Sequence, residues 1–159
     1  MLASALAAAA LAATPGAQLR ATYQARYADR LVPLLSEVLR YDTVEDHAGA
    51  FAEQRAWLTG AATALGLEVK DQGSFIEVEL PGPAGAPVLG LIVHGDVQPA
   101  DPREWTVSPF SGEVRSGEVW GRGAADDKGP LVQALLAMAT LRASGLPRTS
   151  TVRLLVGTA

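Results

Sequence analysis

The sequence predicts an α/β fold in which helices are combined with a mostly parallel sheet. Segments with helical periodicity alternate with short segments of strand character along the chain. Residues 88–93 form a nearly continuous apolar run, which is typical of a strand buried on both faces of such a sheet. With 159 residues, of which 48% are hydrophobic and 19% charged, the chain can form one domain with a substantial core.

Two helices are expected in the first part of the chain. Between residues 18 and 41, apolar side chains recur at steps of three and four, which predicts one amphipathic helix bent at Pro33. A second helix is expected over residues 49–65. Gly66 follows it and suits the left-handed position that ends many helices.

The later elements alternate between strands and a helix. Residues 68–70 and 75–80 have strand character, and the regular alternation of the second segment predicts an edge or half-exposed strand. The polar stretch 96–117 is too long for an ordinary connection, so we expect a functional loop there. A third helix is expected over residues 129–141, and a last apolar strand over 151–156.

Residues 1–17 are interpreted as an export signal, because they are apolar, rich in alanine and too short to span a bilayer. No Lys or Arg precedes Arg20, so either a basic start is missing or the segment is an ordinary helix. Residues 18–159 would then form the domain. We expect a periplasmic or secreted protein with no membrane span, and otherwise a cytoplasmic one.

Charge and cysteine content exclude several functions. A net charge of -4 provides no basic stripe for a phosphate backbone, so nucleic acid is not an expected partner. Cysteine is absent, which excludes disulfides, thiolate zinc sites and a cysteine nucleophile. Any metal ion must therefore be held by His, Asp or Glu.

The first candidate cluster, His94-Gly95-Asp96, follows the apolar strand directly. In an extended segment the side chains of His94 and Asp96 project to the same side, at the sheet edge where α/β proteins bind ligands. A histidine beside a carboxylate is a metal ligand with its orienting group, or a base with its orienting group. The alternative is a histidine that only caps the loop through hydrogen bonds.

The second cluster is Gly121-Arg122-Gly123-Ala124-Ala125-Asp126-Asp127-Lys128-Gly129-Pro130, which leads into the third helix. Glycines permit sharp turns, and carboxylates are favoured at a helix start. Either aspartate could instead be a simple N-cap. A dinucleotide-binding loop is disfavoured because the third glycine of its fingerprint is missing.

Together, HGDVQPADPREW and SPFSGEVRSGEVWGRGAADDKGP resemble the M20 metallopeptidases. The doubled aspartate before Lys-Gly-Pro is most similar to the dipeptidase branch, which includes carnosinase-like and PepV-like enzymes. The resemblance is strong over residues 88–141. It implies an incomplete three-layer α/β/α zinc-peptidase-like catalytic domain and cleavage of dipeptides or short peptides by a metal-bridged water.

The resemblance also implies roles for single residues. His94 would bind one metal ion, Asp96 would orient the site beside it as a catalytic residue, and Asp126 would bridge two Zn²⁺ ions and be followed by a cis peptide. Other divalent metals remain possible. Arg122, Asp127 and Lys128 would support the site without binding metal. His47 matches no ligand pattern and is expected to be a solvated loop histidine.

The sequence departs from the family pattern at its end. Family members continue from the last strand into a glutamate pair, whereas no Asp, Glu or His follows Asp127 here. We therefore expect a truncated catalytic domain that is inactive as given, without the lid and dimerisation domain through which a full-length form would form a homodimer. Alternatives are an N-acyl-amino-acid deacylase of the acetylornithine or succinyl-diaminopimelate type, and a non-catalytic binding fragment.

Overall fold

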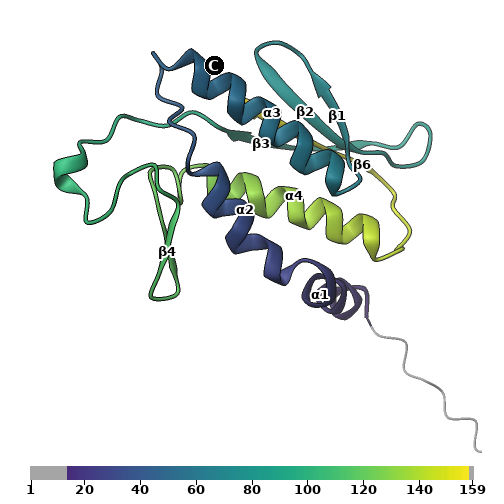
Figure 1. Ribbon diagram of the computed structural model, residues 1–159. Coiled ribbons are helices and arrows are strands. Elements are labelled where there is room, and N and C mark those ends of the chain that lie inside the picture. The colour runs from purple at the N-terminus through teal and green to yellow at the C-terminus, as the bar shows by residue number, and fades with distance from the viewer. Residues whose placement is uncertain (1–13, 158–159) are drawn as a thin grey trace, which may run out of the picture.

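The computed structural model describes residues 14–157 and confirms the α/β class (Figure 1). The expected signal segment lies mainly outside the described residues, and its expected end after residue 17 falls inside the first helix. No helix of the described part is long and apolar enough to cross a membrane. The elements are α1 (Pro15–Arg26), η1 (Ala28–Arg30), α2 (Leu31–Val38), α3 (Ala48–Ala64), β1 (Glu68–Asp71), β2 (Phe75–Leu80), β3 (Val88–His94), η2 (Pro102–Glu104), β4 (Glu113–Arg115), β5 (Glu118–Trp120), α4 (Lys128–Ala143) and β6 (Thr151–Gly157).

The main sheet is mixed and has the strand order β1-β2-β6-β3. A mostly parallel sheet was expected, but in the described residues only β3 and β6 are parallel, whereas β1 pairs with β2, and β2 with β6, in the antiparallel sense. On one face of the sheet, α3 packs against β1 and β2, and α4 packs against β3 and β6 (Figure 1). Their apolar side chains share one core with those of β2 and β6. The parallel pairing places the carboxyl end of β3 beside the end of β6.

The helix expected over residues 18–41 is interrupted at Tyr27 and not at Pro33. α1 ends where the Tyr27 N–H donates to the carbonyl of Tyr23, and η1 then redirects the chain into α2. Pro33 lies in the first turn of α2, where a missing N–H breaks no helical hydrogen bond. Because of the break, α1 and α2 can each contact α4.

The two strand environments expected from the sequence were wrong. β2 was expected to be an edge or half-exposed strand, but it lies between β1 and β6 and most of its residues are buried. β3 was expected to be buried on both faces, but in the described chain it is an edge strand, and Ile92 is 81% exposed. An apolar run reports the hydrophobicity of a strand, whereas strand order depends on pairing with segments distant in sequence.

The stretch 96–117 is not a single loop, because its end forms the first strand of the β4–β5 hairpin. This hairpin is fixed to α2 where the Ser36 hydroxyl donates to the Gly112 carbonyl at 2.6 Å. Gly112 has a φ of +60°, and an added Cβ would lie 1.9 Å from the Ser36 carbonyl oxygen. Only glycine fits at this contact.

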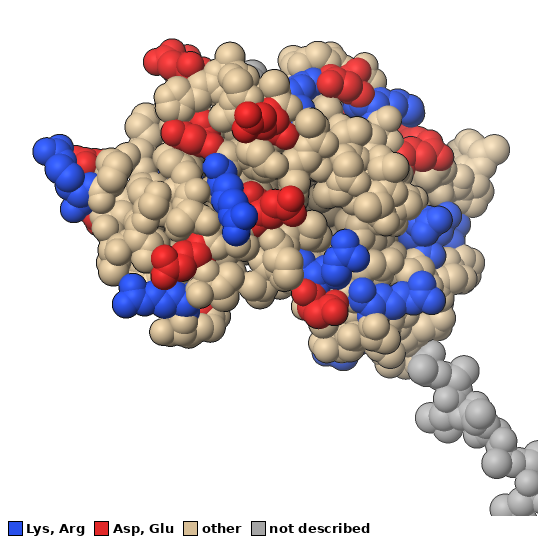
Figure 2. All heavy atoms as spheres, in the orientation of Figure 1, with Lys and Arg blue, Asp and Glu red and all other residues tan. Residues whose placement is uncertain are grey.

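The sheet face opposite α3 and α4 carries a network of ion pairs. Arg153 on β6 contacts Glu79 at 2.5 Å and Glu77 at 3.4 Å, and Lys70 on β1 lies 3.4 Å from Glu77. These ion pairs balance the charges of Glu77 and Glu79, which lie on the central strand β2. On the molecular face shown in Figure 2, acidic and basic side chains are interspersed.

The pH dependence of the free energy of unfolding should reveal the contribution of the Arg153–Glu79 pair. The hydrogen bond from Arg153 holds the pKa of Glu79 below its ordinary value of 4.5, against the opposing effect of burial. A carboxylate with a lowered folded pKa adds stability above its unfolded pKa, and this stability is lost as the pH falls through the folded value. We therefore expect Arg153→Gln to destabilise the chain at pH 7, and this effect to be lost as the pH falls below 4.5 and through the lowered pKa of Glu79.

Urea unfolding of both proteins at several pH values measures the difference in free energy of unfolding. Arg103→Gln is the matched control, because Arg103 is 90% exposed and pairs with Asp101 two residues away. Such an exposed local pair is expected to contribute little at any pH. If Arg153→Gln destabilised the chain equally at pH 7 and pH 3, the stabilisation would not come from the pairing of Arg153 with the Glu79 carboxylate.

Candidate functional site

The site is centred on His94, the last residue of β3. The next residue, Gly95, donates its N–H to the carbonyl of Gly157 at 2.8 Å, which fixes the chain to the end of β6. The His94 Nδ1 atom lies 3.1 Å from the backbone oxygen of Asp96 and 3.4 Å from its carboxylate. His94 and Asp96 thus face the same side, as their spacing predicts.

Asp126 completes the opposite side of the imidazole. Its Oδ1 atom lies 3.0 Å from His94 Nε2, although the two residues are 32 positions apart in sequence. The Asp126 side chain is 88% exposed and that of His94 is 42% exposed, so both are accessible from solvent. The peptide bond between Asp126 and Asp127 is cis, as the resemblance implied.

Asp127 occupies the N-cap position of α4, but its side chain makes no capping hydrogen bond. Its Oδ2 atom instead accepts from the His94 backbone N–H at 3.3 Å. The alternative of a simple helix cap therefore does not describe the Asp127 carboxylate, which joins the start of α4 to the end of β3.

Lys128 is fully buried, and its Nζ atom donates to the Tyr41 carbonyl at 2.6 Å. Burial lowers the pKa of Lys128 to about 8, and the charges of Asp42 and Asp96 partly oppose this effect. Lys128 points away from solvent and fastens the start of α4 to the segment after α2. This position agrees with a supporting role.

The charge state of His94 depends on opposing effects. Burial by itself lowers the pKa of His94. The hydrogen bond to the Asp96 backbone, the charge of Asp96, the hydrogen bond to Asp126 and the charge of Asp127 outweigh burial, so the pKa of His94 is raised. The site is therefore electrostatically suited to positive charge on or beside the imidazole.

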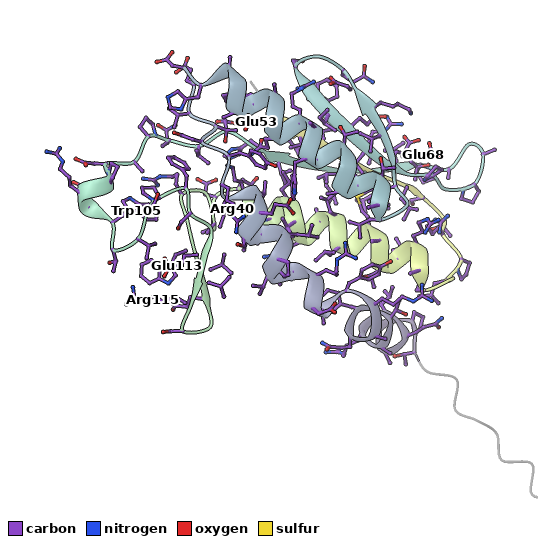
Figure 3. The ribbon with its side chains drawn as sticks, in the orientation of Figure 1. Arg40, Glu53, Glu68, Trp105, Glu113 and Arg115 are labelled. Atoms are coloured by element: carbon purple, nitrogen blue, oxygen red, sulfur yellow. The ribbon has the colours of Figure 1, made fainter. Side chains whose placement is uncertain are left out.

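A cavity of about 490 Å³ adjoins this pair and is lined in part by His94, Asp96, Trp105, Arg122 and Asp126. The Arg122 guanidinium lies 5.5 Å from the Trp105 ring centre, in cation–π range, and donates to the Pro99 carbonyl at 3.3 Å. Trp105 follows η2 on the side of the β4–β5 hairpin (Figure 3). Arg122 thus closes one wall of the cavity.

A second, mostly apolar hollow lies between α1 and α4 and includes Tyr23, Leu136 and Leu141. It contains none of the clustered carboxylates or histidines. The cavity beside His94 is therefore the candidate active site.

The donors beside the cavity fit a zinc-type ion. Zinc is bound in proteins by imidazole nitrogen and carboxylate oxygen, and Asp96 on Nδ1 leaves Nε2 as the atom that faces Asp126. Within residues 14–157, however, no group of three or more His, Asp or Glu side chains is arranged to hold a metal ion. The described residues therefore supply only part of a ligand set.

Two buried residues at the site were not identified from the sequence. Thr43 Oγ1 and Gln54 Nε2 both donate to the Gly95 carbonyl, at 2.6 and 2.9 Å. A signal for Gln54 was present, because this polar residue lies on the same helical stripe as Phe51 and Leu58. Thr43 lies between helices and is on no such stripe.

His47 was expected to be a solvated loop residue. Its side chain is 51% exposed at the start of α3, and its Nδ1 atom lies 3.1 Å from the Asp42 carboxylate. It is not among the residues that line the cavity beside His94.

The fold and site together define an α/β domain with an imidazole–carboxylate pair at the carboxyl end of a strand. Residues 90–159 match the family described as Peptidase family M20/M25/M40. This match confirms, over residues 90–159, the resemblance of the two motifs to the M20 peptidases.

Among its relatives is a putative dipeptidase, YtjP, of Bacillus subtilis (strain 168), which is 33% identical over 142 residues, 84% of this chain and 30% of the relative. A probable succinyl-diaminopimelate desuccinylase of Staphylococcus epidermidis is 32% identical over 128 residues, 80% of this chain and 32% of the relative. The chain thus spans about a third of the length of these relatives.

The fold is similar to that of human carnosine dipeptidase 1, with a TM-score of 0.77 and 22% sequence identity. The match covers 91% of this chain and 35% of that structure. At this level of identity, the likeness concerns the fold alone.

Proposed function

We propose that this chain is part of a metal-dependent hydrolase that cleaves dipeptides or short peptides. The observation that carries the proposal is the 3.0 Å approach of His94 Nε2 to Asp126 Oδ1. The two residues come from separate motifs and meet beside a cavity. If His94 only capped its own loop, its imidazole would have no reason to lie beside Asp126 of the second motif.

In this proposal His94 would hold one zinc ion, and Asp126 would contribute its carboxylate to both ions of a two-zinc site. Asp96 holds the imidazole through Nδ1, so that Nε2 remains directed at Asp126. Zinc, when bound, supplies Lewis-acid activation of water and of the scissile carbonyl. Arg122 shapes the cavity wall, while Asp127 and Lys128 hold the start of α4 in place.

The dipeptidase assignment is supported by the relation to the putative dipeptidase YtjP. A second candidate is removal of an acyl group from an amino acid. It is favoured by the probable desuccinylase and by another desuccinylase, from Xanthomonas euvesicatoria, that is 51% identical over 55 residues. Both reactions hydrolyse an amide bond, so the site described here fits either.

Two measurements test the proposal. We expect the 159-residue chain to bind zinc weakly and to show no turnover of dipeptides, because no acidic or imidazole side chain follows Asp127. The protein purified from its source, with its intact mass recorded, is expected to hydrolyse dipeptides when zinc is added. It should act more slowly on N-succinyl and N-acetyl amino acids.

A reversed substrate preference would support the deacylase candidate. If the purified protein hydrolyses neither substrate class but binds zinc, the binding-fragment alternative is correct. Turnover by the 159-residue chain at an ordinary enzyme rate would show that the site needs no further residues.

A further inference from the structure

Buried polar side chains are concentrated around the site. Within the described residues, six polar or charged side chains are buried, and three of them, Thr43, Gln54 and Lys128, bond to backbone atoms of the site or beside it. Burial of a polar group costs free energy unless it is hydrogen-bonded. Half of this set therefore serves to fix the backbone near His94 and Asp126.

The carbonyl of Gly95 receives two of these bonds. Thr43 approaches it from the segment between α2 and α3, and Gln54 approaches it from α3 itself. The Val97 N–H also donates to the Thr43 carbonyl at 2.9 Å. The peptide that connects Gly95 to Asp96 is thereby held from two directions.

The same segment also reaches the other motif. Lys128, two residues after Asp126, donates to the carbonyl of Tyr41, two residues before Thr43. The backbone of residues 41–43 therefore contacts both motifs that carry the site. It is a physical connection between His94 and Asp126 that involves neither side chain.

We propose that Thr43 and Gln54 are positioning residues, which hold the His94–Asp96 segment at the separation from Asp126 that a shared metal ion requires. This inference rests on the proposed function. Groups that orient metal ligands through hydrogen bonds commonly change metal affinity by about 10–100-fold when removed. A small displacement of His94 Nε2 would separate it from Asp126 Oδ1, which now lies at 3.0 Å.

A purely structural role for Thr43 predicts a different result, because it would affect stability without affecting metal affinity. Thr140 provides the comparison. It is 6% exposed, and its hydroxyl donates to the Leu136 carbonyl at 2.7 Å within α4. Thr43→Val and Thr140→Val each remove one buried hydroxyl at nearly constant volume, so their stability losses should be similar.

The test is an NMR titration of the His94 imidazole signals with zinc chloride, together with thermal unfolding. We expect Thr43→Val to weaken zinc binding by about 10-fold or more, and Thr43→Ser, which keeps the hydroxyl, to restore it. Thr140→Val should leave zinc affinity unchanged. Equal zinc affinity in wild type and Thr43→Val, or equal losses in both valine variants, would overturn the proposal.

Amide hydrogen exchange at Gly95 and Val97, measured without zinc, separates this inference from the proposed function. If neither the 159-residue chain nor the protein purified from its source binds zinc, the proposed function fails, yet faster exchange in Thr43→Val and not in Thr43→Ser still supports positioning. Unchanged exchange overturns it. If Thr43→Val does not fold, Gln54→Met, which approximately conserves volume, takes its place in the same measurements.

Discussion

Replacing His94 with alanine is expected to abolish zinc binding by this chain. The sequence has two histidines and no cysteine, so the variant keeps no imidazole or thiolate near Asp126. Carboxylates alone are poor zinc ligands compared with a set that includes imidazole. The loss should exceed about 100-fold, which is more than changes around a metal site usually cause. Isothermal titration with zinc chloride measures it.

His47→Ala is the matched control, because it removes the other histidine of the chain. His47 lies beside Asp42 and does not line the cavity. We expect this variant to bind zinc as the wild type does. If His94→Ala retained wild-type affinity, or if His47→Ala lost it, zinc would bind elsewhere and the proposed centre would be wrong.

Gly95→Ala is expected to destabilise the chain and weaken zinc binding together. An added Cβ would lie 2.2 Å from Gln54 Oε1 and 3.1 Å from its Cδ, well inside normal contact distance. Gln54 is 1% exposed and cannot move aside freely. Overpacking of this kind costs about 1–3 kcal/mol, and the backbone shift that relieves it would displace His94. Urea unfolding and zinc titration provide the two measurements.

Gly90→Ala, on the strand that leads to Gly95, is the control, because nothing lies within 4 Å of the Cβ it would add. It should be neutral or slightly stabilising. The double variant Gly95→Ala/Gln54→Ala should be more stable than the sum of the two single losses predicts, since shortening Gln54 removes the obstructing atom. Strict additivity would show that the two residues do not collide.

The sequence predicted which residues meet at the site better than it predicted the surroundings of these residues. The two motifs identified His94, Asp96 and Asp126 because their residue types and order match a known family. The structure brings these three residues together beside one cavity. Their roles as ligands and orienting group stay predictions until zinc binding is measured.

Thr43 and Gln54 could not be assigned in the same way. Each acts through one hydrogen bond to the carbonyl of Gly95, which lies 52 and 41 residues away, respectively, in the chain. A polar residue on an apolar helix face indicates that some partner exists. It does not indicate which partner, because that depends on how α3 packs near the end of β3.

Local patterns by themselves determined α3, α4 and the position of Gly66, which follows α3 and has the expected positive φ. These features depend on neighbouring residues, so the sequence contains the required information. Only the tertiary structure decided that β2 is central, that β3 is at an edge of the described sheet, and that residues 41–43 join both motifs. Each of these depends on contacts between segments far apart in the chain, where one local pattern is compatible with several partners.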